Sequence, residues 1–212
     1  MAISFCRTNE NYAEKILRQK QIREIKKEIF RKTIHLCTAF IPLFLDRFYW
    51  PIIILLSLVL VAYIICEFLR IKGITVPIIS KITDIASRKR DENRFVLGPV
   101  TLALGVLITA LCFPSMPAKI GILALALGDG LASLFGKVFG HVYIPLTSGK
   151  TVAGSLTCFI AIFLSTWVCS GNVVCALFVG IAGMLIEVFP LKNYDNLALP
   201  ILVAFISCFL VL

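Results

Sequence analysis

The chain has 212 residues, of which 59% are hydrophobic and only 16% charged, and its mean hydropathy is +0.94. A soluble domain is nearer to half apolar and a quarter charged, so this composition argues against a water-soluble globule and indicates a membrane protein. The net charge of +9 is typical of the lysines and arginines that set membrane topology, and we expect no nucleic-acid partner.

The first 32 residues are polar and carry nine basic and four acidic side chains. Within them Ile22, Ile25 and Ile29 recur at helical spacing among lysines and arginines. This pattern predicts an amphipathic helix that lies against anionic lipid headgroups. We therefore divide the chain into a basic cytosolic segment, 1–32, and a transmembrane domain, 33–212.

The transmembrane domain contains seven apolar runs, the first and last of them short. We expect an all-α, polytopic integral membrane bundle of about seven transmembrane helices, because a span needs roughly 20 apolar residues. A cytosolic N-terminus would place 19 of the 21 lysines and arginines inside, which is the orientation that the positive-inside rule favours. The runs are 33–48, 50–69, 95–113, 118–135, 151–169, 173–189 and 197–212.

Three carboxylates, Glu67, Asp129 and Glu187, fall inside apolar runs. A charge inside a span is costly and usually faces a polar site. All three lie toward the predicted cytosolic ends of their runs, so we expect them to converge at one depth. The alternative for Glu67 is an ion pair with Arg70, three residues later on the same helix.

The stretch 127–155 holds six of the 13 glycines, interleaved with lysine, serine and threonine. Glycine permits the close backbone approach that phosphate binding needs, and cations neutralise phosphate oxygens. The alternative is tight helix packing, for which the spacing of Gly136 and Gly140 is typical. Gly149, Lys150 and Thr151 imitate the end of a P-loop, but residue 144 is isoleucine where that motif needs glycine.

These residues resemble a known signature. The pattern that starts at Asp129 and ends at Gly154, D-x-x-A-x-x-x-G-x-x-x-G followed by G-K-T-x-A-G, is similar to the CTP-binding signature of the dolichol kinase, phytol kinase and CTP-dependent diacylglycerol kinase family. Gly149 and Ala153 stand where the dolichol-kinase form has lysine and glutamate, so this ending is closer to the phytol kinase variant. Shorter resemblances are E-x-x-R-K-x-x-H at 28–35, E-x-x-R at 67–70 and D-N-x-x-x-P at 195–200.

The resemblance implies that the transmembrane domain is catalytic and transfers the γ-phosphate of CTP to a membrane lipid alcohol, such as a polyprenol or dolichol, a phytol-like isoprenoid alcohol or diacylglycerol. It also implies a divalent metal, for which we expect Mg²⁺. We assign Asp129 to this ion or to orienting the lipid hydroxyl, Glu187 or Asp195 to completing the metal shell, and Lys150 to the phosphates. His35 is a candidate base, with headgroup binding or packing as the alternative. Such an enzyme would reside in the plasma membrane of a prokaryote or an internal membrane, such as the endoplasmic reticulum, of a eukaryote. The other residues assigned to the nucleotide are Gly128, Ala132, Gly136, Lys137, Gly140, Thr151, Gly154, Ser155, Arg31, Lys32, Arg94 and Asn196.

Two other functions fit the same residues. A CTP:lipid-phosphate cytidylyltransferase would use a similar basic pocket and metal but would release pyrophosphate. A small transporter or scaffold would use the embedded carboxylates for ions and the glycines for helix packing. Neither the lipid nor the oligomeric state follows from the sequence.

Overall fold

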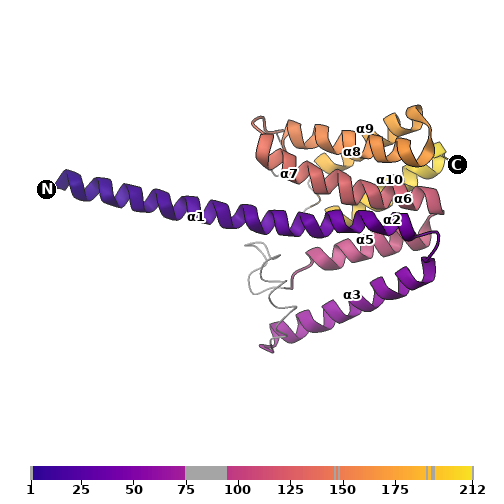
Figure 1. The fold of residues 1–212 in the computed structure, drawn as a ribbon, viewed down its shortest axis with the longest axis horizontal. Helices are drawn as coiled ribbons and strands as arrows, with labels where there is room; N and C mark the ends of the chain where they lie inside the picture. The colour runs from indigo at the N-terminus through magenta and orange to yellow at the C-terminus, as the bar shows by residue number, and fades with distance from the viewer. Residues whose placement is uncertain are drawn as a thin grey trace.

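The computed structural model describes residues 2–74, 95–145, 147, 149–189, 191 and 194–211, and this part of the chain is an all-α bundle (Figure 1). The prediction of an all-α membrane bundle is confirmed. The helical elements are α1 (Ala2–Cys37), η1 (Thr38–Phe40), α2 (Ile41–Phe44), α3 (Tyr49–Ile71), α5 (Gly98–Cys112), α6 (Ser115–Leu123), η3 (Ala124–Asp129), α7 (Gly130–Phe139), α8 (Val152–Ser170), α9 (Val173–Val188) and α10 (Asp195–Val211).

Within the described residues, three helical stretches are long and apolar enough to cross a membrane: Tyr49–Ile71, Ser115–Phe139 and Val152–Ser170. The second of these runs through α6, η3 and α7 without a break in the helical backbone. Helices α5, α9 and α10 are apolar but shorter. The predicted first run, 33–48, is divided among the end of α1, η1 and α2, because Pro42 has no N–H to donate and occupies the first turn of α2.

Helix α1 is continuous across the predicted boundary at residue 32 and extends well beyond the other helices (Figure 1). Ile22, Ile25 and Ile29 are exposed along it. Its last turns pack against α7 and η3. The contact with lipid headgroups and the division of the chain at residue 32 remain predictions.

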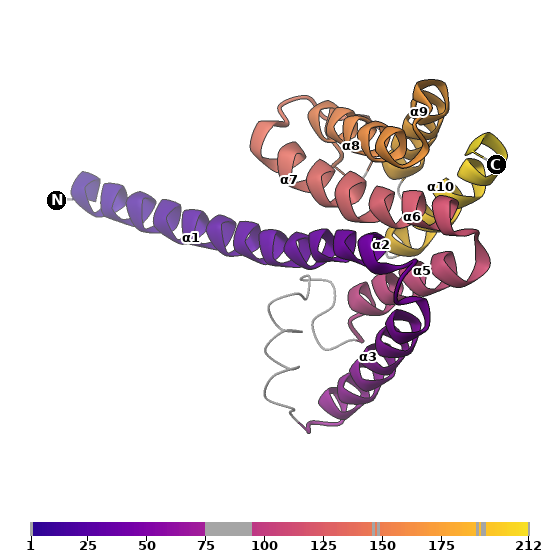
Figure 2. The same ribbon diagram turned by 45° about the vertical axis from the view of Figure 1, so that its right-hand side comes forward.

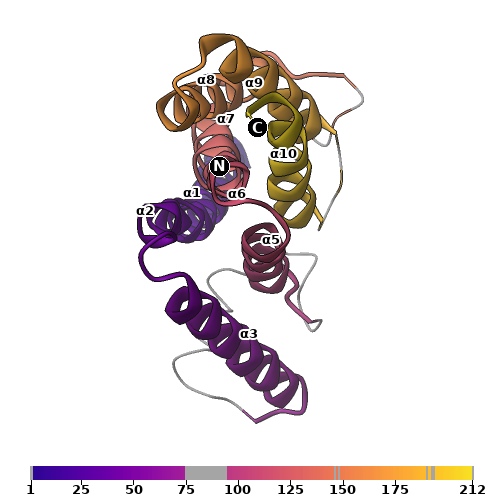
Figure 3. The ribbon, with the colours of Figure 1, turned by 90° about the vertical axis from the view of Figure 1, so that its right-hand side faces the viewer.

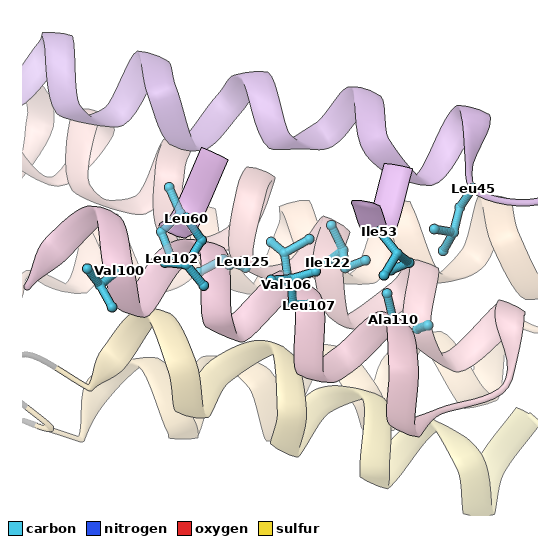
Figure 4. Close-up of a cluster of buried hydrophobic side chains, with 11 residues drawn as sticks. Leu45, Ile53, Leu60, Val100, Leu102, Val106, Leu107, Ala110, Ile122 and Leu125 are labelled. Carbon is cyan, nitrogen blue, oxygen red and sulfur yellow. The ribbon is translucent and has the colours of Figure 1, made fainter. Parts of the chain in front are cut away.

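The stretch from α6 to α7 lies at the centre of the bundle. Viewed along the bundle, it is surrounded by α1, α5, α8 and α10, while α3 lies at the edge beside α5 (Figures 2 and 3). One apolar core joins α3, α5 and α6 through residues such as Ile53, Val106 and Ile122 (Figure 4). A second core, which includes Ile162, Val179 and Val203, joins α6, α8, α9 and α10.

Helix α10 approaches its neighbours closely because two glycines face it. A Cβ on Gly105 of α5 would lie 2.3 Å from the backbone oxygen of Asn196, and one on Gly121 of α6 would lie 2.4 Å from that of Pro200. Pro200 has no N–H to donate to the carbonyl of Asn196 four residues earlier, which leaves this oxygen on the helix surface. The packing of α5 and α6 against α10 therefore requires residues without side chains.

Candidate functional site

A cavity of about 480 Å³ lies where α1 meets the end of α9 and the starts of α8 and α10. Five segments line it: α1, the central stretch around Asp129, the connection from α7 into α8, the end of α9 and the start of α10. Charged side chains from all five segments reach it, which is uncommon within a bundle of apolar helices. This concentration of charge makes the cavity the candidate functional site.

Helix α1 contributes Glu28, Arg31 and Lys32, and His35 lies one turn further along the same face. Arg31 Nη2 lies 2.5 Å from Glu28 Oε1, and Lys137 Nζ of α7 lies 2.9 Å from Glu28 Oε2. Burial raises the pKa of the Glu28 carboxyl, but Arg31 and Lys137 lower it by more, so that it falls below its usual 4.5. Glu28 thus stays ionised and holds two cations at the cavity wall.

Asp129 reaches the cavity from the π-helical segment η3. A π-helical turn inserts an extra residue into a helix, and such turns are frequent at functional sites. The Asp129 residue is buried, and its carboxylate forms a salt bridge with Lys32, which is also buried. His35 Nδ1 lies 3.3 Å from Asp129 Oδ2 and has no hydrogen-bond partner among the described residues. His35 stands behind the carboxylate and does not line the cavity.

A short antiparallel bridge precedes α8 and fixes the wall on that side. Tyr143 pairs with Thr151, and the Ile144 N–H donates to the Lys150 carbonyl over 2.9 Å. The Thr151 hydroxyl then caps α8 by accepting from the Gly154 N–H at 3.2 Å. Gly149, with φ of +87°, makes the turn within this connection.

Helices α7 and α8 meet at glycines. A Cβ on Gly154 would lie 2.8 Å from the carbonyl oxygen of Ala132, and one on Gly136 would lie 2.8 Å from the Thr151 hydroxyl. These residues line the cavity floor. Side chains here would push the helices apart and fill the space where a ligand would bind.

A second lysine–carboxylate pair, partly buried, lies where the end of α9 meets the start of α8. Lys150 Nζ forms a salt bridge with Glu187 Oε1 at the end of α9. Burial lowers the pKa of the Lys150 ammonium, but Glu187 raises it by more, so the net pKa lies above its usual 10.5 and the group stays charged. Among the described residues, neither Glu187 Oε2 nor the buried hydroxyl of Ser155 has a hydrogen-bond partner.

Helix α10 begins at the cavity with Asp195 and Asn196. The Asn196 amide lies 3.3 Å from the carbonyl oxygen of Gly98 and 3.4 Å from the hydroxyl of Thr101, both on α5. Asn196 therefore anchors the start of α10 to α5 and fixes the position of Asp195.

The described lining is balanced in charge. It has four cations, Arg31, Lys32, Lys137 and Lys150, and four carboxylates, Glu28, Asp129, Glu187 and Asp195. No cluster of three or more histidine, cysteine, aspartate or glutamate side chains suited to a metal alone occurs in the described part of the chain. The cavity is thus suited to a ligand that presents both negative and positive charge, such as a polyphosphate with its metal ion.

Most of the sequence-predicted site residues meet in this cavity. Gly128 and Gly140 do not line it: Gly128 packs against Ile162, and Gly140 packs against Thr151 and Gly136. Arg94 lies outside the described residues. The residues that do line it are Arg31, Lys32, Asp129, Ala132, Gly136, Lys137, Lys150, Thr151, Gly154, Ser155, Glu187, Asp195 and Asn196.

The expected convergence of three embedded carboxylates is wrong for Glu67. This fully buried side chain accepts from Arg70 at 2.7 and 2.9 Å and from the Val96 N–H at 2.8 Å. It joins α3 to the segment before α5 and is not part of the cavity lining. The alternative interpretation, a local pair with Arg70, is confirmed.

Four lining residues were not predicted as site residues: Glu28, Ser133, Tyr143 and Gly149. A signal existed for Glu28, which precedes Lys32 by one helical turn and so shares its face. For Tyr143 the sequence offers no such signal, because the bridge to Thr151 depends on the fold of the connection.

The fold and the cavity together define an α-helical membrane protein with a charged site at one end of its bundle. Over 183 residues the chain is 32% identical to an uncharacterized protein of Methanocaldococcus jannaschii, with 85% of this chain and 92% of that protein aligned. The chain belongs to the family of that archaeal protein. No family profile matches the chain, and no solved structure matches it.

The chain is also similar to plant phytol kinases over part of its length. It is 31% identical over 93 residues to phytol kinase 1 of Arabidopsis thaliana, and 26% identical over 154 residues to a probable phytol kinase 1 of Oryza sativa. These alignments cover 42% and 67% of this chain but only 30% and 46% of the plant proteins. The chain thus spans less than half the length of the phytol kinases that it matches.

Proposed function

We propose that this protein is a lipid-alcohol kinase that transfers the terminal phosphate of CTP to the hydroxyl of a membrane lipid, with Mg²⁺. The observation that carries the proposal is that Asp129 and the glycine- and lysine-rich stretch around it line the same cavity as Arg31 and Lys32 of α1. The partial similarity to phytol kinases supports a phosphotransferase. The choice of CTP rests on the signature at 129–154.

Phosphoryl transfer depends mainly on positioning and on neutralising the charge of the phosphates. Lys137 of α7 and Lys150, just before α8, both line the cavity. Arg31 and Lys32 of α1 line it as well. The Ser155 hydroxyl, which has no hydrogen-bond partner in the described part of the chain, supplies one further donor. These groups would bind the triphosphate by exchanging their carboxylate partners for phosphate oxygens.

The carboxylates fit Mg²⁺, which binds one or two protein carboxylates together with phosphate oxygens and water. Asp129, Glu187 and Asp195 line the same cavity, and Glu187 Oε2 is buried without a partner among the described residues. Asp129 together with Glu187 or Asp195 would hold the ion along with phosphate oxygens, and the ion would neutralise phosphate charge. Asp129 would also orient the lipid hydroxyl, and His35 would support Asp129 from behind.

The position of the cavity suits a lipid acceptor. Large apolar side chains such as Leu156 of α8 and Phe189 beyond α9 are exposed beside the lining residues Ser155 and Glu187. A lipid chain could remain in hydrocarbon along these helices while its hydroxyl enters the cavity. We propose a multi-pass arrangement with the N-terminus and the cavity on the cytosolic side, where CTP is available.

The proposal is tested with the full chain purified in detergent and supplied with Mg²⁺ and a mixed panel of isoprenoid alcohols, diacylglycerol and phosphatidate. CTP labelled with ³²P in the γ position should label a lipid alcohol, and CTP labelled in the α position should label none. Asp129→Asn should abolish this transfer, because the carboxylate that orients the hydroxyl is lost.

Asp46→Asn serves as the matched control, because this carboxylate forms an ion pair with Lys119 outside the cavity lining. It should retain wild-type transfer. Lipid labelling from the α position instead would show cytidylyltransfer, and no labelling from either position would refute both nucleotide reactions.

A further inference from the structure

We infer that Tyr143 is the residue on which the nucleobase of the donor stacks, an inference that rests on the proposed nucleotide-dependent function. Tyr143 is the one aromatic side chain in the described lining of the cavity. It is 66% exposed, so most of its ring surface is free to be covered by a ligand.

The cavity divides by chemistry into two parts. Arg31, Lys32, Lys137 and Lys150 supply charge suited to phosphates. A nucleobase is flat and only weakly polar on its faces, and it gains little from such groups. Proteins that bind bases without reading their edges use aromatic rings on which the base stacks. In the described lining, the Tyr143 ring alone offers such a face.

The backbone holds Tyr143 at a fixed position relative to the phosphate-binding residues. It lies opposite Thr151 in the antiparallel bridge, which places two Cβ atoms roughly 5 Å apart. The Val152 N–H donates to the Val142 carbonyl at 3.0 Å on one side of this pair. On the other side, the Ile144 N–H donates to the Lys150 carbonyl at 2.9 Å.

The turn beyond the bridge is also held by hydrogen bonds. The Thr147 hydroxyl donates to the Ile144 carbonyl at 2.7 Å and accepts from the Lys150 N–H at 3.2 Å. The ring is therefore carried by a hydrogen-bonded bridge that leads into Lys150 and the cap of α8. A ligand whose phosphates contact Lys150 would have its base within reach of the ring, and little ordering of the protein would be needed.

An alternative role for an exposed tyrosine in a membrane protein is to anchor the chain at the lipid interface. Tyr194 provides the comparison, because it is 60% exposed and precedes α10 but does not line the cavity. If both tyrosines only anchor the chain, replacing either one should affect ligand binding equally. If Tyr143 stacks on the base, only its replacement should weaken binding of ligands that carry a base.

The test compares binding of CTP and of inorganic tripolyphosphate, each with Mg²⁺, to the full chain in detergent, by calorimetry. Tyr143→Ala should weaken CTP binding by about 10- to 100-fold, the usual effect of losing one stacked base, and should leave tripolyphosphate binding unchanged. Tyr143→Phe should bind CTP nearly as well as the wild type, because the ring remains. Tyr194→Ala should change neither affinity.

Two outcomes overturn the inference. If Tyr143→Ala binds CTP as tightly as the wild type, the ring makes no contact with the base. If it loses CTP and tripolyphosphate equally, Tyr143 only maintains the bridge to Thr151. Binding of neither ligand by the wild type would instead refute the proposed function, a failure that is recognised before any variant is compared.

Discussion

Replacement of Lys32 by methionine should destabilise the protein more than any other single loss of a lysine described above. Lys32 and Asp129 are separated by 97 residues in sequence, and their side chains are 4% and 9% exposed. Loss of one partner leaves a buried charge without compensation, which typically costs about 3–5 kcal/mol. The expected loss of stability does not come from poorer membrane insertion, because Lys32→Met removes a charge and leaves the apolar helices unchanged.

The loss is large relative to a typical folding free energy of about 5–15 kcal/mol. A double variant, Lys32→Met with Asp129→Asn, should recover most of it, because no uncompensated charge remains. The matched control is Lys119→Met, which breaks an ion pair whose side chains are 23% and 61% exposed. Exposed pairs contribute about 0–1 kcal/mol, so this variant should unfold almost as the wild type does.

The assay is reversible unfolding in mixed micelles by increasing denaturing detergent, followed by tryptophan fluorescence and circular dichroism. The apparent free energy of unfolding is compared among the wild type, the two single variants of the pair, the double variant and the control. The reasoning is refuted if Lys32→Met lies within about 1 kcal/mol of Lys119→Met. It is also refuted if the effects of the two single substitutions in the pair simply add.

Two further predictions concern packing and pH. Gly121→Ala should cost about 1–3 kcal/mol in unfolding free energy, because its Cβ would lie 2.4 Å from the Pro200 carbonyl oxygen and 2.9 Å from the Ala204 Cβ. Gly98→Ala, with nothing within 4 Å of its Cβ, should be neutral or slightly stabilising in the same assay, and equal losses would contradict this account. Because the pKa of Glu28 is lower in the folded protein than its usual 4.5, its contribution is complete above that pH and is lost as the pH falls through the folded value. The difference in thermal midpoint between the wild type and Glu28→Gln should therefore stay constant from pH 7 to about 4.5 and shrink below that pH. A difference that stays constant below pH 4.5 as well would show that the Glu28 charge is not involved.

Much of the fold follows from local patterns in the sequence. Hydropathy alone predicts the positions of α3, α5, α8, α9 and α10 to within a few residues, because each helix must expose an apolar surface to lipid. Helix ends coincide with residues that favour them, such as Asn172, which caps α9, and Gly171, whose positive φ ends α8. The break near Pro42 follows from the missing N–H of proline.

The arrangement within the site could be predicted only in part. The resemblance to the CTP-binding signature identified most of the lining residues. The ion-pair partners, such as Lys32 with Asp129 and Lys150 with Glu187, depend on contacts between distant segments of the chain. The π-helical turn at η3 has no local sequence signal. Glu67 illustrates the limit: an apolar run does not reveal whether its carboxylate faces a cavity or a backbone N–H.

Under the proposed function, the charge balance of the cavity has a physical reason. Four bare cations at the end of a membrane bundle would repel one another and would be expensive to remove from water. Pairing each of them with a carboxylate avoids this cost in the absence of ligand. A triphosphate alone would bring negative charge close to Glu28, Asp129, Glu187 and Asp195, whereas a triphosphate with its divalent ion offers partners to the cations and to the carboxylates at once. The arrangement therefore favours joint binding of nucleotide and metal over binding of either one alone.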